Sequence, residues 1–136
     1  MRDIAKAYWE APTTEGRALY RDRCVPLYNY DQSVSSDWQT RILWRNETAL
    51  WFKGPKNEHG RMDFRSDPRR IECSTLLLVG DEDPITPPVF SEEIAAGLSR
   101  DNLTYVKYSK CGHGVIADKP DEAYAEIRRF VLSSYA

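Results

Sequence analysis

Apolar and polar residues alternate with different periodicities in the two halves of the chain. Near the start, four apolar residues fall on one face of a helix: Ile4, Ala5, Tyr8 and Trp9. A break at Pro12 follows, and Thr13 or Thr14 can cap a second helix that runs to about Cys24. The opening pattern therefore predicts helices.

The helical pattern continues to about residue 53 and then stops. Ser35 or Ser36 can cap a third helix in which Trp38, Ile42 and Arg45 share a face, and the apolar stretch from Thr48 to Phe52 follows. Residues 54–70 hold few apolar side chains and many turn formers, which is typical of a linker. We therefore expect a helical segment over 1–53, a linker over 54–70 and a separate structure over 71–136.

The last part of the chain predicts two strands and two helices. Thr75 to Val79 is a continuous apolar run, which suits a strand buried on both faces of a parallel sheet, and Leu103 to Tyr108 predicts a second strand. Between them, Thr86 can cap a helix with Pro87 at its first position. The order strand, helix, strand, helix indicates an α/β fold with a βαβα unit of parallel strands.

Both helices of this unit carry an apolar stripe. The inner face of the first is expected to comprise Phe90, Ile94 and Leu98. The second begins at Pro120, and its predicted stripe comprises Ala123, Ile127, Phe130 and Val131. Two strands alone cannot cover the apolar strand Thr75 to Val79 on both sides, so we expect a further strand beside it, from sequence outside this chain.

Candidate chemistry lies in the loops that follow the two strands. Asp83 comes three residues after the first strand, and His113 stands between two glycines after the second. In parallel sheets such loops meet at one edge and carry functional residues. The carboxylate of Asp83 can then accept the Nδ1 proton of His113, which leaves Nε2 as a general base for a nucleophile.

Asp83 has a simpler alternative role, and the other candidate sites in the sequence are weaker. Asp83 can cap the turn before Pro84, and the acidic run from Asp81 to Asp83 could suggest a metal site, although no second acidic cluster accompanies it. Cys111 lies two residues before His113, but neighbours in a tight loop seldom face each other for proton transfer. His59 lies in the linker and is expected to be solvated.

Composition narrows the function classes. The 136 residues are 41% hydrophobic and 29% charged with a net charge of −2, so no basic face for nucleic acid is expected. The sequence has no apolar run long enough for a membrane span and no signal-peptide core. Three widely spaced cysteines suit reduced thiols, so we expect a cytoplasmic protein.

The segment GDEDPITPP, followed by CGHG thirty residues after Asp83, resembles the terminal signature of α/β-hydrolases. The stretch 71–136 most resembles the proline iminopeptidase group, and the segment 1–53 resembles the end of its cap domain. The resemblance implies that Asp83 is the triad acid and His113 the triad base. A Gly-x-Ser-x-Gly nucleophile motif does not occur in the sequence, so the nucleophile would come from a missing N-terminal half.

The resemblance implies hydrolysis of an ester or amide in a small molecule or short peptide, and it implies neither a metal nor a cofactor. In the proline iminopeptidase group, carboxylates of the cap hold the substrate amine, and Glu10 after Trp9 is our candidate for that role. Two alternatives stay open. One is a haloalkane- or epoxide-type hydrolase with an Asp nucleophile. The other is a non-catalytic remnant that binds a partner, for example along its strand edge.

Overall fold

The computed structural model describes residues 1–33, 43, 45–52 and 61–134. The chain forms two compact units: Met1–Leu27 with Ser35–Asp63, and Tyr28–Val34 with Phe64–Ala136. Trp38 and Ile42 of the predicted third helix, and residues 53–60 of the predicted linker with His59, lie outside the described residues. Arg45, the third residue of that predicted helical face, is extended rather than helical.

The described part of the first unit is mainly helical. It contains α1 (Arg2–Glu10), α2 (Thr14–Arg23) and α3 (Asn46–Trp51), and the 3-10 turn η1 (Val25–Tyr28) follows α2. The predicted cap of α2 is confirmed, because the Thr13 hydroxyl accepts a hydrogen bond from the Gly16 N–H at 2.9 Å. Tyr8 and Tyr20 are buried with their ring centroids 4.5 Å apart, whereas Trp9 is 43% exposed, so the predicted stripe of α1 is only partly covered.

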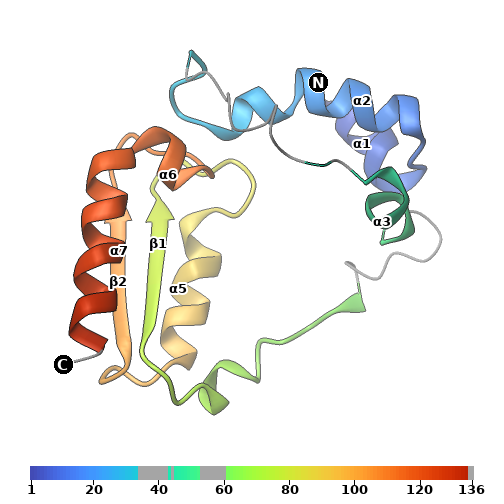
Figure 1. Cartoon of the computed structure of the whole chain (residues 1–136). Helices are drawn as coiled ribbons and strands as arrows, with labels where there is room; N and C mark the ends of the chain where they lie inside the picture. The colour runs from blue at the N-terminus through green and yellow to red at the C-terminus, as the bar shows by residue number, and fades with distance from the viewer. Residues whose placement is uncertain (34–42, 44, 53–60, 135–136) are drawn as a thin grey trace. The chain divides into compact units, whose positions relative to one another are not determined.

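The second unit contains the predicted parallel sheet. β1 (Thr75–Gly80) pairs with β2 (Leu103–Tyr108), with Thr75 opposite Leu103 and Gly80 opposite Tyr108. The helices α5 (Pro88–Gly97) and α7 (Pro120–Ser134) follow the two strands, as the sequence predicts (Figure 1). A short 3-10 turn, η3 (Pro68–Arg70), packs against α5.

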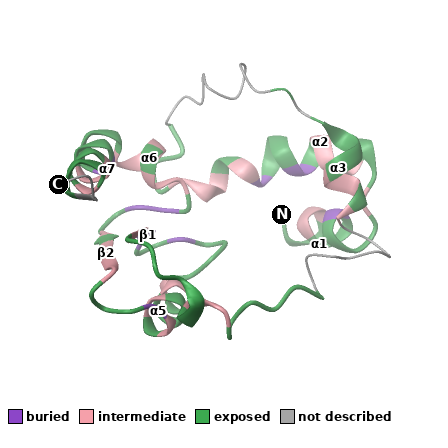
Figure 2. Ribbon diagram, turned by 60° about the horizontal axis from the view of Figure 1, so that its bottom comes forward, coloured by how far each residue is buried: buried purple, intermediate pink, exposed green. Residues whose placement is uncertain are grey.

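The two helices lie on opposite faces of the sheet. Lys107 of β2 forms an ion pair with Glu92 of α5 at 3.3 Å. The next residue, Tyr108, lies near Glu122 and Glu126 of α7, which raise the pKa of its hydroxyl after the larger effect of burial. Successive strand residues point to opposite faces, so α5 and α7 cover different sides of the strands (Figure 2).

Two details of α5 correct the sequence prediction. The helix begins at Pro88 with Pro87 before it, and Thr86 does not cap it, because the Thr86 hydroxyl donates to Asp83 instead. Of the predicted inner face, Leu98 is buried, but Phe90 and Ile94 are 52% and 44% exposed. The sheet is only two strands wide within the described residues, so it covers too little of the helix to bury them.

β1 itself shows the same shortage of cover. Val79 and Gly80 at its carboxyl end are buried, while Thr75 to Leu78 are only half-buried. The predicted burial on both faces is therefore found only at the end of the strand nearest the candidate site. Among the described helices, none combines the length and the apolar character that crossing a membrane requires.

Candidate active site

The parallel register of the strands brings the two candidate loops together. Gly80 and Tyr108 are opposite each other at the carboxyl ends of β1 and β2. The loop with Asp83 leaves the first end, and the loop with His113 leaves the second. The Asp81 N–H donates to the Tyr108 carbonyl at 3.0 Å and the Glu82 N–H to the Cys111 carbonyl at 3.0 Å, so backbone bonds join the loops directly.

Asp83 meets His113 as the sequence predicts. Oδ2 of Asp83 lies 2.9 Å from Nδ1 of His113. The same oxygen accepts a hydrogen bond from the Thr86 hydroxyl at 2.8 Å, and that hydroxyl is 3.3 Å from Nδ1. When Nδ1 carries the ring proton it donates to the carboxylate, and Nε2 is left to accept a proton from another group.

The second oxygen of Asp83 holds the loop. Oδ1 accepts hydrogen bonds from the backbone N–H of Ile85 at 2.8 Å and from that of Thr86 at 2.9 Å. The simpler alternative for Asp83, a turn cap, is therefore also correct. Because the carboxylate is bonded by the turn, it cannot swing away from His113 without breaking these bonds.

The environment of Asp83 favours the charged form. Burial opposes ionisation, since only 9% of the residue is exposed. The hydrogen bonds from the Thr86 N–H, from His113, from the Ile85 N–H and from the Thr86 hydroxyl together outweigh burial and lower the pKa of Asp83. An ionised carboxylate beside Nδ1 is the state that supports an imidazolium on His113.

His113 combines a fixed backbone with an accessible ring. Its N–H donates to the Tyr28 carbonyl at 2.7 Å, and the ring of Tyr28 meets its ring edge-on with centroids 5.4 Å apart. The side chain is 40% exposed, in contrast to 8% for Asp83. The imidazole can therefore reach a reacting group while its buried partner sets its orientation.

Close backbone approach explains two glycines of this site. A Cβ at Gly80 would lie 2.1 Å from the Gly112 carbonyl oxygen, and a Cβ at Gly112 would lie 2.2 Å from the Tyr28 carbonyl oxygen. These distances are far below contact, so a larger residue would push the His113 loop off the end of β1 or off residue 28. The two glycines thus allow the His113 loop to lie directly against the end of β1 and against residue 28.

Sequence reasoning missed three participants. Thr86 could have been found, since the spacing from Asp83 to Thr86 suits a side chain that accepts N–H groups two and three residues later. Tyr28 contacts the His113 loop from a distant part of the sequence. Asp118 lies only six residues after Gly112, but it also binds the N–H groups of Tyr30 and Asp31, which are far from it in the sequence. The contacts with residues 28–31 arise from tertiary structure alone.

The surroundings of the other two candidate residues differ, since Cys111 is buried whereas Glu10 lies on the surface. Cys111 is fully buried, and burial raises the pKa of its thiol to about 11, so it is protonated and not exposed as a nucleophile at neutral pH. Within the described residues, no three potential metal ligands of the His, Cys, Asp or Glu type gather at one place. Glu10 lies on α1 with its side chain 66% exposed, 4.0 Å from Lys6, which is an ordinary surface pair.

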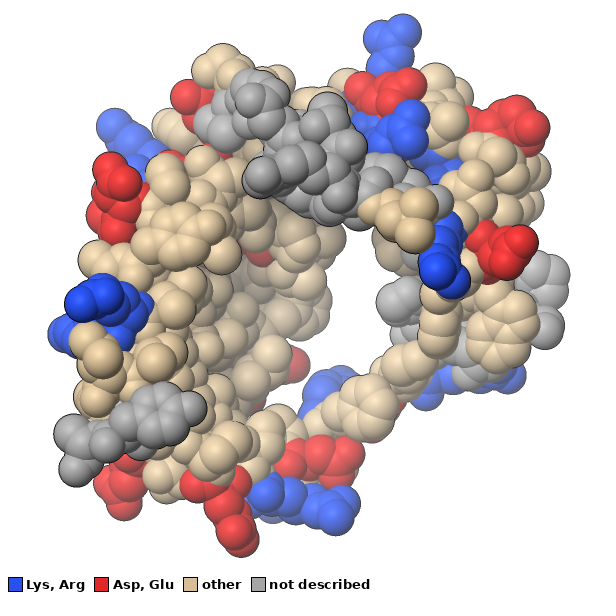
Figure 3. Space-filling model, in the orientation of Figure 1, with Lys and Arg blue, Asp and Glu red and all other residues tan. Residues whose placement is uncertain are grey.

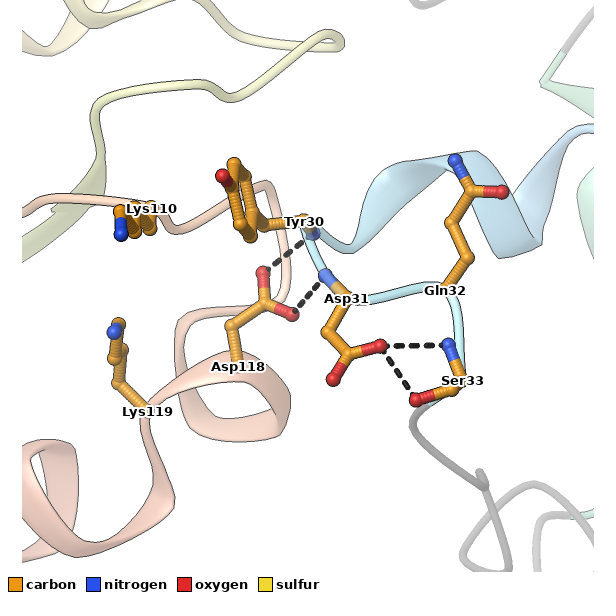
Figure 4. Close-up of a pocket in the computed structure, with 7 residues that line it drawn as sticks. All are labelled: Tyr30, Asp31, Gln32, Ser33, Lys110, Asp118 and Lys119. Carbon is orange, nitrogen blue, oxygen red and sulfur yellow. Dashed lines mark hydrogen bonds between the residues drawn. The ribbon is translucent and has the colours of Figure 1, made fainter.

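A surface hollow of about 540 Å³ lies beside the His113 loop and includes neither Asp83 nor His113. We call it the Lys110 hollow, and it is lined by Tyr30, Asp31, Gln32, Ser33, Lys110, Asp118 and Lys119 (Figure 4). Basic and acidic side chains are interspersed over the face of the molecule seen in Figure 3. The hollow itself mixes both signs of charge.

No family model matches the chain. It is 27% identical over 139 residues to a non-heme haloperoxidase of Rhodococcus erythropolis, and the match covers 96% of this chain and 50% of that protein. The chain therefore spans about half the length of the curated relative.

Solved structures agree on the fold. An esterase of Thermogutta terrifontis aligns with a TM-score of 0.70 at 19% identity, over 99% of this chain and 49% of the esterase. A meta-cleavage product hydrolase aligns with a TM-score of 0.68 at 18% identity, over 97% of this chain and 50% of the hydrolase. The chain has the fold of the C-terminal half of α/β-hydrolase structures.

Proposed function

We propose that this chain supplies the acid and base of an α/β-hydrolase that cleaves an ester or amide, with Asp83 as the acid and His113 as the base. The observation that carries the proposal is the 2.9 Å contact between Asp83 Oδ2 and His113 Nδ1, with a buried carboxylate and an accessible ring. The fold supports it, since the loops that carry the pair follow the last two strands in the order Asp, then His.

The chemistry of the pair follows from its geometry. Nε2 of His113 takes the proton of an attacking hydroxyl, and the imidazolium that results is stabilised by the Asp83 carboxylate. The same proton is then available to the leaving alcohol or amine. Thr86 and the Ile85 N–H keep the carboxylate in place throughout, so the pair needs little reorganisation.

The nucleophile comes, in this proposal, from polypeptide that this sequence does not include. The chain covers half of its relatives' length, and the sequence has no Gly-x-Ser-x-Gly motif. The partner is thus an N-terminal α/β segment whose strand adds beside β1. That segment can be the preceding part of the same polypeptide or a separate chain.

The test is hydrolysis of p-nitrophenyl acetate by this chain joined to, or mixed with, the upstream coding sequence that supplies the nucleophile motif. We expect turnover only when both parts are present, and a loss of roughly a thousandfold or more in His113→Ala and Asp83→Ala. Asp81→Asn is the matched control, since that exposed carboxylate stands two residues from Asp83. Full activity in His113→Ala would refute the proposal.

The same assembly separates the alternatives. A trapped ester on a serine indicates acyl transfer, whereas one on an aspartate indicates the haloalkane- or epoxide-type reaction. Assembly without any turnover favours a non-catalytic binding module. Turnover by this chain alone that His113→Ala abolishes would mean that the chain contains its own nucleophile.

The narrower proposal of a proline peptidase rests on the resemblance carried by the segments GDEDPITPP and CGHG and on the position of Glu10 directly after Trp9. We propose that Glu10, which is exposed in this chain, binds the substrate amine once the missing segment covers it, because a cation that leaves water needs a paired anion. In the assembled enzyme, Glu10→Gln should then lower the rate on proline naphthylamide more than the rate on a neutral acyl ester. Equal effects on both substrates would remove Glu10 from the site.

A further inference from the structure

Asp118 occupies the end of a short helix, α6 (Val115–Asp118), that the sequence pattern does not predict. Its carboxylate accepts three backbone N–H groups. Oδ2 accepts a hydrogen bond from the N–H of Gly112 at 2.7 Å. Oδ2 also accepts from the N–H of Tyr30 at 2.8 Å, and Oδ1 accepts from the N–H of Asp31 at 3.3 Å (Figure 4). One carboxylate thus ties residues 30–31 to the residue that precedes His113.

The residue after Gly112 is held by the same segment. The His113 N–H donates to the Tyr28 carbonyl, and the Tyr28 ring stands against the His113 ring. Gly112 packs so closely on this segment that a Cβ would lie 2.9 Å from the Tyr30 nitrogen. Residues 28–31 therefore form a support beneath the His113 loop, and Asp118 is the side chain that attaches the support.

We propose that Asp118 is a positioning residue for the Asp83–His113 pair. Its charge strengthens each N–H contact relative to a neutral acceptor. Without it, Gly112 loses its acceptor and the Tyr28 segment loses two of its attachments, so the His113 ring can rotate or shift away from Asp83 Oδ2. The catalytic meaning of this role rests on the function proposed above, but the structural claim does not.

The carboxylate is specific for this task. In Asp118→Asn one oxygen becomes an amide that donates, so at least one of the three N–H groups faces another donor. In Asp118→Glu both acceptor oxygens remain on a side chain longer by one methylene. The two variants therefore separate loss of the acceptor from mere substitution at the position.

The sequence contains only two histidines, His59 and His113, which makes the ring of His113 easy to follow. The test is the ¹⁵N-histidine NMR spectrum of the full 136-residue chain, read at the Nδ1–H proton of His113, with the reaction of each histidine with diethyl pyrocarbonate measured by mass spectrometry. An Nδ1–H bonded to a carboxylate resonates far downfield, and Asp83→Asn identifies that signal by removing it.

We expect Asp118→Asn to broaden or abolish this signal and to raise the modification rate of His113 about fivefold relative to His59, as loss of one net hydrogen bond would. Asp118→Glu should restore the signal. Asp121→Asn, which removes a carboxylate three residues later, is the control and should leave both readouts unchanged.

An unchanged His113 signal in Asp118→Asn overturns the positioning role. Loss of the far-ultraviolet circular dichroism signal in that variant also overturns it, since Asp118 would then support the whole fold. If the unaltered chain lacks the downfield signal, the Asp83–His113 bond itself is absent, and the proposed function fails rather than the role of Asp118 alone.

Discussion

The two carboxylate oxygens of Asp83 have different partners, one in its own loop and one at the candidate catalytic histidine. Oδ1 closes the turn through Ile85 and Thr86, and Oδ2 faces His113 and the Thr86 hydroxyl. A residue that is bonded on both oxygens keeps its orientation without help from a substrate. This arrangement links the stability of the loop to the protonation of one carboxyl group.

The pKa of Asp83 predicts a specific dependence of stability on pH. Burial raises this pKa, but hydrogen bonds to Thr86, His113 and Ile85 lower it below 3.8, its ordinary value. The folded pKa is thus below the unfolded one, so the stabilisation is complete above pH 3.8 and is lost as the pH falls through the folded pKa. Urea unfolding at a series of pH values should show this loss.

Asp83→Asn removes the titrating group, so this part of the pH dependence should be missing from its unfolding profile. Asp81→Asn keeps Asp83 intact, and its profile should overlay that of the unaltered chain. Parallel profiles for all three proteins would show that Asp83 ionises equally in the folded and unfolded states.

The Thr86 hydroxyl should contribute to stability through its hydrogen bond to Asp83. Thr86→Val keeps the shape of the side chain but removes the hydroxyl that donates to Asp83 Oδ2. We expect a loss of about 1 kcal/mol in the free energy of unfolding, since the buried carboxylate loses one donor. Thr86→Ser retains the hydroxyl and should lose less. The measurement is urea unfolding at neutral pH, and equal losses in the two variants would mean that the hydroxyl contributes nothing.

At the scale of elements, the regular part of the second unit could be predicted from the sequence. A continuous apolar run identified β1 and an alternating pattern identified β2. The order of elements required parallel strands, which placed Asp83 near His113. The start of α5 was wrong by one residue, because Thr86 binds Asp83 rather than the helix. Local patterns predict elements well when burial is regular.

The support beneath His113 could not be predicted in this way. α6 has only four residues, which is too short for a periodic pattern. Residues 28–31 join the second unit through Asp118 and Tyr28, and such a pairing of a carboxylate with distant backbone N–H groups leaves no trace in residue spacing. Contacts of this kind depend on the folded chain.

Gly112→Ala tests whether the His113 loop must pack closely on residues 28–31. The added Cβ would meet backbone atoms of Tyr28 and Tyr30, which cannot move aside as a flexible side chain can. We expect a loss of about 1–3 kcal/mol in the free energy of unfolding from this overpacking. Gly16→Ala is the control, because its Cβ meets only the Thr13 hydroxyl at 3.2 Å. Circular dichroism during urea unfolding measures both, and equal stabilities would show that the loop moves freely.

For the molecule as a whole, the sheet and its helices indicate a fold that needs further cover. In the described part of the chain β1 pairs with β2 alone, and α5 exposes apolar side chains. The match to about half of each relative agrees with this incomplete cover. The exposed strand edge and the apolar face of α5 are then surfaces on which the nucleophile-bearing segment of the proposed enzyme would pack.

The isolated chain should therefore associate with itself. Val89, Phe90 and Ile94 of α5 are 53%, 52% and 44% exposed, and unpaired strand edges and apolar patches of this kind favour association. Sedimentation velocity at increasing concentration should show growth in the mean mass. The double variant Phe90→Lys with Ile94→Lys should stay smaller at the same concentration and keep the circular dichroism of the unaltered chain. A monomer that unfolds in one cooperative transition at every concentration would show that the chain covers its own apolar surface, and the requirement for a second segment would lose its structural basis.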